Sequence, residues 1–396
     1  MELTALAAHG AETKAVAFGA RFAAATDTKG QLWLWAGAEG SMRPEAPGPW
    51  RVKLPEYAAS VAATHDGLVV VTMRGRALML EGVGEWVCAL DAAAGALVTP
   101  ASPPRALGGD AARRRIVGVS GGGDHALLLD SNGAVLAVGA NDRGQLGLGG
   151  EPGEGQRVAE PRLVGGALAG RKVAAASCGE RHSLCVTEDG KLFAFGDDKW
   201  LQLGLRDGSV SSLKTGLELR AEPTEVDVIS VLKSAGHVSE ASRDPQRWRV
   251  LFAAAGGAHS LIALRDTRSD ITCLVSCGHG RWGQLGDGLF RHISAPREVK
   301  GVSGREEWDE NAQKRVPISV RGLAAGSEHS AALLSSGDVM VWGHNGLSQQ
   351  GTGNRVGNSA PTRVRALTGI PLSRLSCARN SCAAWAESWT AAQLQR

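Results

Sequence analysis

Residues 177–205 read SCGERHSLCVTEDGKLFAFGDDKWLQLGL, and this pattern decides the fold because the chain repeats it. The segments HSLCVT and KLFAFG are apolar runs of strand length, and EDG between them supplies the residue types of a tight turn. After the second run come a glycine and the segment LQLGL, which predict an irregular loop. The stretch therefore predicts a β-hairpin with a loop behind it.

Three further segments, beginning at Ser120, Ala255 and Ala325, carry the same pattern. In every copy a histidine opens the first strand, a glycine closes the second, and a glutamine follows that glycine by six residues. The histidine-to-glycine interval is 14 residues in three copies and five longer in the copy from Ala255, where we place the excess in the polar turn RDTRSD. The repeated residues are His125, His182, His259 and His329, with Gly139, Gly196, Gly278 and Gly343 and with Gln145, Gln202, Gln284 and Gln349.

Two weaker copies near the N-terminal end keep the interval, from Phe22 to Ala36 and from Gly67 to Glu81, and a seventh copy begins at Leu375 but stops before the second strand of its hairpin. Glycine-rich repeats of paired strands indicate an all-β protein whose units must stack to bury both faces. We therefore predict one domain over residues 1–396, a seven-bladed β-propeller. Residues 3–8 are expected to complete the last blade, so that the N- and C-terminal segments together close the ring.

In four copies a Pro-x-x-Val segment follows the loop, as PRLV, PTEV, PREV or PTRV. Proline has no N–H to donate to a strand ladder, so it is confined to edge strands. Each of these segments is therefore predicted to form the edge strand of its blade.

Long inserts interrupt the repeat at residues 205–249 and 301–321. Loops above a rigid scaffold carry variable function, so each insert is a candidate contact surface, with an ordinary solvated loop as the alternative. The second insert places a tryptophan among charges, the combination that protein interfaces favour. Its candidate partner-binding residues are Arg305, Glu306, Glu307 and Trp308.

The run Arg113, Arg114 and Arg115 is a further candidate contact, for an acidic protein or an RNA backbone. A solvated charge run is its alternative. The whole chain has a formal net charge of only +3, which does not by itself indicate nucleic acid. No stretch approaches the roughly 20 apolar residues of a transmembrane helix.

The histidines and cysteines, which could act as catalytic groups or metal ligands, fit structural roles better. The four histidines occupy equivalent places in different blades, which predicts repeated packing or hydrogen bonding rather than convergence on a metal. Seven cysteines, an odd number, argue against a disulfide framework and for a reducing compartment, and Cys273 and Cys277 are expected to be buried thiols. No P-loop or nucleophile elbow is present. We therefore predict no catalytic residue, no cofactor and no metal.

The GQLG-type loops, the Gly-x-x-His strand starts and the four full copies resemble the regulator of chromosome condensation family. That resemblance covers nearly the whole chain and implies a seven-bladed propeller. Members of the family include an exchange factor for the Ran GTPase, a plant ultraviolet receptor, ubiquitin-ligase modules and mitochondrial proteins, so the fold does not fix the function. The receptor's GWRHT repeats are absent here, and only Trp200 and Trp282 lie in the GQLG-type loops, so ultraviolet sensing is not expected.

The segment DDKWLQLGL and the insert after Phe290 resemble the mitochondrial branch of that family. That branch implies a mitochondrial location, with cytoplasm or nucleus as the alternatives. The leading hypothesis is a non-catalytic scaffold or assembly factor that docks onto a larger protein complex, contacting RNA if the complex is a ribonucleoprotein. The alternative is a guanine-nucleotide exchange factor for a small or dynamin-like GTPase.

Overall fold

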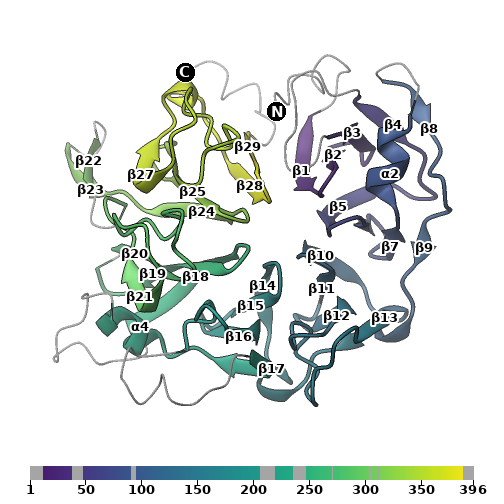
Figure 1. Ribbon diagram of the computed structural model, residues 1–396, viewed down its shortest axis with the longest axis horizontal. Coiled ribbons are helices and arrows are strands. Elements are labelled where there is room, and N and C mark those ends of the chain that lie inside the picture. Colours follow the sequence, from purple (N-terminus) through teal and green to yellow (C-terminus); the bar gives the residue numbers. More distant parts are fainter. Residues whose placement is uncertain are drawn as a thin grey trace.

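The computed structural model describes residues 12–37, 48–90, 95–205, 219–234, 247–269, 271–302, 306–309 and 313–386. Seven β-sheets, antiparallel apart from one short parallel pair in the first, stand around a central cavity (Figure 1). The chain forms them in sequence order, except that it returns once from the second sheet to add the last strand of the first. The protein is therefore the all-β, seven-bladed propeller that the repeats predict.

Each blade begins with a strand that lines the cavity. These innermost strands are β1 (Thr13–Phe18), β5 (Ala58–Ala63), β10 (Ile116–Gly121), β14 (Val173–Cys178), β18 (Trp248–Ala255), β24 (Val320–Ala325) and β28 (Arg374–Ala378). The second strands are β2 (Phe22–Asp27), β6 (Leu68–Thr72), β11 (His125–Asp130), β15 (His182–Thr187), β19 (His259–Asp266), β25 (His329–Leu334) and β29 (Ser381–Trp385).

The third strands are β3 (Leu32–Ala36), β7 (Ala77–Leu80), β12 (Val135–Ala140), β16 (Leu192–Asp197), β20 (Thr272–Gly278) and β26 (Val339–Gly343). The outer strands are β4 (Trp50–Val52), β9 (Arg105–Ala106), β13 (Arg157–Leu163), β17 (Leu219–Glu225), β21 (Ile293–Glu298) and β27 (Asn358–Arg363). The Pro-x-x-Val segments supply β13, β17, β21 and β27, each at a sheet edge, which confirms the proline prediction. In the first blade a further short strand, β8 (Leu97–Val98), pairs parallel with β4.

The histidine-to-glycine interval is the register of the hairpin. His125 pairs with Gly139, and His182, His259 and His329 pair with the corresponding glycines of their own blades. In the first blade Phe22 pairs with Ala36 in the same way. The longer interval of the β19–β20 hairpin lies only partly in the turn, because both strands are extended to the pair Arg265 and Thr272.

The described part of the hydrophobic core consists of seven clusters, each between two neighbouring blades. Successive side chains of a strand point to opposite faces. In β11, Leu127 joins the cluster shared with the following blade, whereas Ala126 and Leu128 join the cluster shared with the preceding one. The middle strands are consequently apolar on both faces, which explains why their sequences are apolar runs without alternation.

Small residues at the cavity rim let neighbouring blades approach closely. The Gly-x-x-His glycines, Gly122, Gly179, Gly256 and Gly326, would each place a Cβ within 2.7 Å of a backbone oxygen in the next blade. Backbone hydrogen bonds join the blades at this rim: the Gly123 N–H donates to Gly179, and the Ser327 N–H donates to Arg379 of the last blade. The glycine of the repeat is therefore required by backbone contact between blades.

The last blade contains two described strands, β28 and β29, as expected for a copy that stops early. It packs against the first blade: Ala383 and Trp385 share a cluster with Trp33 and Trp35, and the Ser376 Oγ donates to the Val16 carbonyl oxygen at 3.2 Å. The predicted completion of this blade by residues 3–8 falls outside the described residues.

Few helices interrupt the strands in the described residues. The described α-helices are α2 (Val83–Cys88) and α4 (Val228–Ser234), and the described 3-10 helices are η1 (Gly109–Ala111), η2 (Gly166–Leu168) and η5 (Arg365–Leu367). In the parts of the chain described, no helix has the length and apolar character needed to cross a membrane. One hairpin, β22 (Glu306–Asp309) with β23 (Lys314–Pro317), forms a two-stranded sheet separate from the blades.

Candidate interaction surfaces

The repeated histidines bridge adjacent blades. The Nε2 atoms of His125, His182 and His259 lie 2.9–3.0 Å from the Oγ of a serine in the following blade. Each serine also donates to the carbonyl oxygen of the glutamine in the preceding blade's loop, at 2.6–2.8 Å. The serines are Ser183, Ser260 and Ser330. The prediction of a repeated hydrogen-bonding element is confirmed.

This geometry fixes the protonation of the rings. Because each serine uses its only hydrogen on a carbonyl oxygen, it must accept from the histidine, so Nε2 carries the hydrogen. Complete burial lowers the pKa of His125 to about 4 and that of His182 to about 3. The rings are thus neutral at physiological pH and act as interblade hydrogen-bond donors.

Between the sixth and seventh blades the partner of the repeated histidine is a cysteine. The His329 Nε2 lies 3.0 Å from the Cys382 Sγ, and Cys382 is bonded to Cys377, its register partner across β28 and β29. The structure thus differs from the expectation of unpaired cysteines, because antiparallel pairing brings these two Cα atoms within 4.3 Å. The three side chains form a compact group of potential metal ligands, but two are joined in the disulfide.

Four other cysteines are buried thiols. Cys178, Cys185 and Cys273 lie in interblade clusters, and Cys277 is buried against the Gln202 carbonyl oxygen. Burial raises the pKa of Cys178 to about 11. A thiol held in its protonated form is a poor nucleophile and metal ligand. The expectation that Cys273 and Cys277 are buried thiols is confirmed.

The central cavity is lined largely by small residues. Its wall is formed by the seven innermost strands and the turns that follow them, mostly Ala, Gly, Val and Ser residues. Among its lining residues only Glu180 and Arg379 carry side chains charged at neutral pH. The described wall therefore offers little chemistry, and the outer surfaces are the better candidates for function.

The second insert forms the hairpin β22–β23, which extends from the periphery beside the last blades (Figure 1). Glu306 is exposed at its start, and the backbones of Glu307 and Trp308 stand in β22, where Trp308 pairs with Arg315. Lys314 and Arg315 on β23 are exposed. Arg305 lies outside the described residues. Three of the four predicted residues of this insert are therefore brought onto one strand.

The first insert, residues 205–249, is partly described. Its apolar segment forms helix α4, in which Val231 and Leu232 are buried in the core between the fourth and fifth blades. This part of the insert packs against the scaffold. Residues 206–218 and 235–246 lie outside the described part of the chain.

The arginine run precedes β10 and divides into two kinds of side chain. Arg114 makes an ion pair with the buried carboxylate of Asp130, at 2.5 Å from Nη1 to Oδ2. Arg113 and Arg115 are exposed. Asp130 thus compensates one of the three charges within the blade.

Sequence reasoning missed a cluster of rings on the loops behind β16, β20 and β26. Trp200 stacks on His292, with ring centroids 4.6 Å apart, and Trp282 lies 4.9 Å from His344. Both tryptophans remain more than one third exposed. The signal was present, since both precede the glutamine of their loops by two residues, but the residues they contact lie in other blades.

Comparisons with known proteins agree with this architecture. The sequence-family model of the regulator of chromosome condensation repeat matches residues 132–186. A second family model with the same description matches residues 116–145 and 320–349. Repeats and fold together define the class, a propeller of regulator of chromosome condensation repeats. Repeats of that family are therefore present in the chain.

Two relatives show how much is shared. The human E3 ubiquitin-protein ligase HERC2 is 26% identical over 274 residues, which cover 69% of this chain and 5% of HERC2. Human protein RCC2 is 30% identical over 252 residues, which cover 61% of this chain and 42% of RCC2. The chain thus spans less than half of either relative.

Solved structures extend the likeness to nearly the whole chain. Human WBSCR16 superimposes with a TM-score of 0.69 at 21% identity, covering 96% of this chain and 88% of WBSCR16. Prp20p of Saccharomyces cerevisiae, a protein characterised for its binding to Gsp1p and histones, superimposes with a TM-score of 0.65 at 20% identity, covering 94% and 82%. At this identity the likeness shows the fold.

Proposed function

We propose that this protein is a non-catalytic interaction scaffold or assembly factor that docks onto a larger protein or ribonucleoprotein complex through the hairpin β22–β23. The observation that carries the proposal is that this hairpin pairs with none of the blade strands that the structure describes. An isolated two-stranded hairpin is marginally stable in water, so a partner surface would give it the packing that its own sheet lacks.

The composition of the hairpin suits a contact with a charged rim. Glu306 on β22 and Lys314 and Arg315 on β23 are exposed, and Trp308 stands in the same sheet. Tryptophan and arginine are the residues most enriched among interface anchors. We propose Arg305, Glu306, Glu307 and Trp308 as the docking residues, with Arg113 and Arg115 as a second, weaker contact for acidic protein or RNA.

The resemblance of DDKWLQLGL and of the insert to the mitochondrial branch supports a mitochondrial location for this role. Cytoplasm and nucleus are the alternatives. The proteins that co-purify with the tagged chain decide among the compartments.

The test is affinity purification of the tagged full chain, followed by mass spectrometry. We expect a defined complex to co-purify, and we expect the triple variant Glu306→Ala, Glu307→Ala, Trp308→Ala to lose it while keeping its thermal transition. The double variant Glu151→Ala, Glu154→Ala removes two exposed charges on a different loop and serves as the control. Equal recovery of the complex by the triple variant would refute the hairpin as the docking element.

The exchange-factor alternative makes a different prediction. Loops of one propeller face would open the nucleotide site of a GTPase, which requires no catalytic side chain from this chain. A nucleotide-release assay on GTPases found among the co-purifying proteins separates the two. Acceleration well above the spontaneous rate would favour exchange activity over a pure scaffold.

A further inference from the structure

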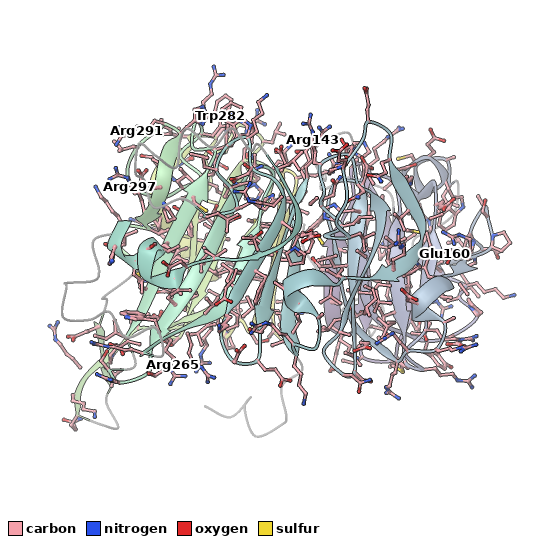
Figure 2. The ribbon with its side chains drawn as sticks, turned by 90° about the horizontal axis from the view of Figure 1, so that it is seen from below. Arg143, Glu160, Arg265, Trp282, Arg291 and Arg297 are labelled. Carbon is pink, nitrogen blue, oxygen red and sulfur yellow. A yellow bond between two sulfur atoms is a disulfide. The ribbon has the colours of Figure 1, made fainter. Side chains whose placement is uncertain are left out.

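Three loops on one face of the propeller form a continuous surface, which we call the tryptophan band. They are residues 198–205, 279–292 and 344–357, and they follow the third strands of three consecutive blades, β16, β20 and β26. Trp282 and Arg291 of the band lie at the upper edge of the molecule together with Arg143, whereas Arg265 lies at the lower edge (Figure 2).

Contacts between loops hold the rings of the band in place. Trp200 of the first loop stacks on His292 and meets the edge of His279, both from the second loop, at centroid distances of 4.6 and 5.0 Å. Trp282 of the second loop contacts His344 of the third at 4.9 Å. Because Trp200 is 36% and Trp282 38% exposed, each presents part of an anchored indole to solvent. Anchored aromatic rings can stack planar ligands at little entropic cost.

The exposed charges of the band are all positive. Its exposed ionic side chains are Lys199, Arg281, Arg291 and Arg355. Within these three fully described loops there are only two carboxylates, Asp198 and Asp287, and both are at most 3% exposed. Each accepts a backbone N–H of its own loop, from Leu203 and Leu289 respectively. The acidic groups therefore shape the loops from inside while the cations face outward.

The cations lie close to the rings. The Lys199 Nζ is 5.7 Å from the centroid of Trp200, and the Arg281 Cζ is 5.8 Å from that of Trp282. A ligand that stacks on an indole would thus place an adjoining anionic group within reach of a cation. Outside the band, the Glu328 carboxylate lies 3.7 Å from the His344 Nδ1, on the third loop. The anionic groups of a ligand are therefore better placed along the first two loops.

The repeated glutamines make the histidines of the band hydrogen-bond donors. The Gln284 Oε1 accepts a hydrogen bond from the backbone N–H of Trp282 at 2.9 Å. The amide nitrogen of Gln284 therefore faces the His279 Nδ1 and donates to it. The Gln349 amide, fixed by the Leu347 N–H, does the same to the His344 Nδ1. An imidazole that accepts at Nδ1 carries its hydrogen at Nε2. The Nε2 atoms of His279 and His344 are therefore hydrogen-bond donors, and the glutamine amides occupy the Nδ1 lone pairs.

We propose that the tryptophan band binds single-stranded nucleic acid, with bases stacked on Trp200 and Trp282 and phosphates held by Lys199, Arg281 and Arg291. One observation favours this ligand over an acidic peptide: Lys199 and Arg281 lie over partly exposed indoles. Single strands present stackable bases and phosphates together. A duplex buries its bases and would use only the cations. The band shares no residue with the hairpin β22–β23 or with the arginine run, so it is a separate contact of the proposed scaffold that succeeds or fails independently of docking.

The test is fluorescence anisotropy of the purified full chain with a labelled oligouridine and a labelled oligothymidine, each about 15 nucleotides long, the upper range for one such binding surface. We expect both strands to bind more tightly than the corresponding duplex. The variant Trp200→Ala, Trp282→Ala should weaken binding at least about tenfold, since each stacked base contributes about 1–3 kcal/mol. Tyr57→Ala, at an exposed aromatic in another blade, should bind as the wild type.

The salt dependence separates charge from stacking. The variant Arg281→Gln, Arg291→Gln should lower the slope of log affinity against log salt by about 1.4, or about 0.7 for each phosphate that is no longer neutralised. The control Arg162→Gln, Arg365→Gln removes two exposed charges elsewhere and should leave the slope unchanged. Circular dichroism and thermal melting of each variant confirm that the propeller is folded.

Three results would overturn the proposal. One is a dissociation constant for single strands weaker than about 100 µM at physiological salt, the weak end of nonspecific nucleic-acid binding. The second is unchanged affinity in the folded variant Trp200→Ala, Trp282→Ala, which would show that binding depends on charge alone and not on stacking. The third is displacement of the strand by polyglutamate at equal charge concentration, which would assign the band to acidic protein segments. Where none of these occurs, preference for the uridine or the thymidine strand identifies RNA or DNA as the ligand.

Discussion

The His182 Nε2 in β15 lies 3.0 Å from the Ser260 Oγ in β19, and the same serine donates at 2.6 Å to the carbonyl oxygen of Gln202, in the loop that follows β16. One hydroxyl of the fifth blade therefore contacts the fourth blade at two points, one in a strand and one in a loop. The same arrangement joins the third blade to the fourth and the fifth to the sixth. The apolar contact between these blades thus contains a repeated polar link.

Removing one hydroxyl should weaken one interface measurably. Ser260→Ala leaves the His182 Nε2–H without its acceptor in a buried interface, and leaves the Gln202 carbonyl oxygen with only the Cys277 thiol as a donor, at 3.5 Å. The loss should cost about 1–3 kcal/mol of unfolding free energy. Urea denaturation followed by tryptophan fluorescence measures the change. The exposed Ser131→Ala should stay within about 0.5 kcal/mol of wild type, and equal values for the two variants would contradict the structural role of the link.

Acid should destabilise the propeller through the buried histidines. Burial lowers the pKa of His259 from 6.5 to about 3 in the folded protein. Between these values the unfolded chain binds a proton that the folded chain excludes, so the stability is fully present above about pH 6.5 and is lost as the pH falls toward the folded pKa. Unfolding free energies at a series of pH values measure the slope. His259→Asn should reduce it by about 1.4 kcal/mol per pH unit between about pH 6 and 4.5. A folded variant with the wild-type slope would show that this ring is protonated in the native state.

The glycine at the end of the β15–β16 hairpin should not tolerate a side chain. Gly196 has a φ of +105°, and a Cβ there would lie 2.6 Å from the backbone oxygen of Arg181. Gly196→Ala should therefore cost at least about 1–3 kcal/mol from backbone strain alone, seen as a lower melting temperature. Gly153→Ala is the matched control, because no heavy atom lies within 4 Å of its added Cβ and its φ is not positive. Similar melting temperatures for both variants would contradict the hairpin geometry.

The disulfide of the last blade should be detectable by peptide mapping. Trypsin cuts after Arg374 and Arg379, so a Cys377–Cys382 bond joins two peptides that separate only on reduction. Cys382→Ser should lower stability by about 2 kcal/mol at most, because the bond closes a short loop. The exposed Cys88→Ser should have no comparable effect. Separate peptides without reductant would show that the two thiols are reduced in the purified protein.

The hairpins were predictable from the sequence because their information is local. The spacing from His182 to Gly196 is the register of one antiparallel pair, and turn residues such as EDG specify where the chain reverses. The edge position of β17 followed likewise from Pro223, since proline has no N–H for a further strand. The structural role of the histidines was predictable because equivalent positions in a repeat take equivalent places around the propeller.

The candidate surfaces were only partly predictable. The insert containing Trp308 was identified by its length and composition, and the structure shows that it forms a hairpin rather than a loop. The contact between Trp200 and His292 could not be predicted, because nothing in the spacing of two loops indicates that one reaches across to the other. The pairing of Cys377 with Cys382 depended on the register of two strands in an incomplete copy.

The sequence by itself determined the strand pairs, their register and their sevenfold repetition, because these depend on residue periodicity over short stretches of chain. Only the tertiary structure decided which side chains of different blades meet: the serine opposite each histidine, the carbonyl oxygen against each rim glycine, and the tryptophans gathered with cations on one face. Those contacts depend on how rigid sheets stack and on which loops lie side by side, and this arrangement is set by packing over the whole molecule rather than by any segment of it.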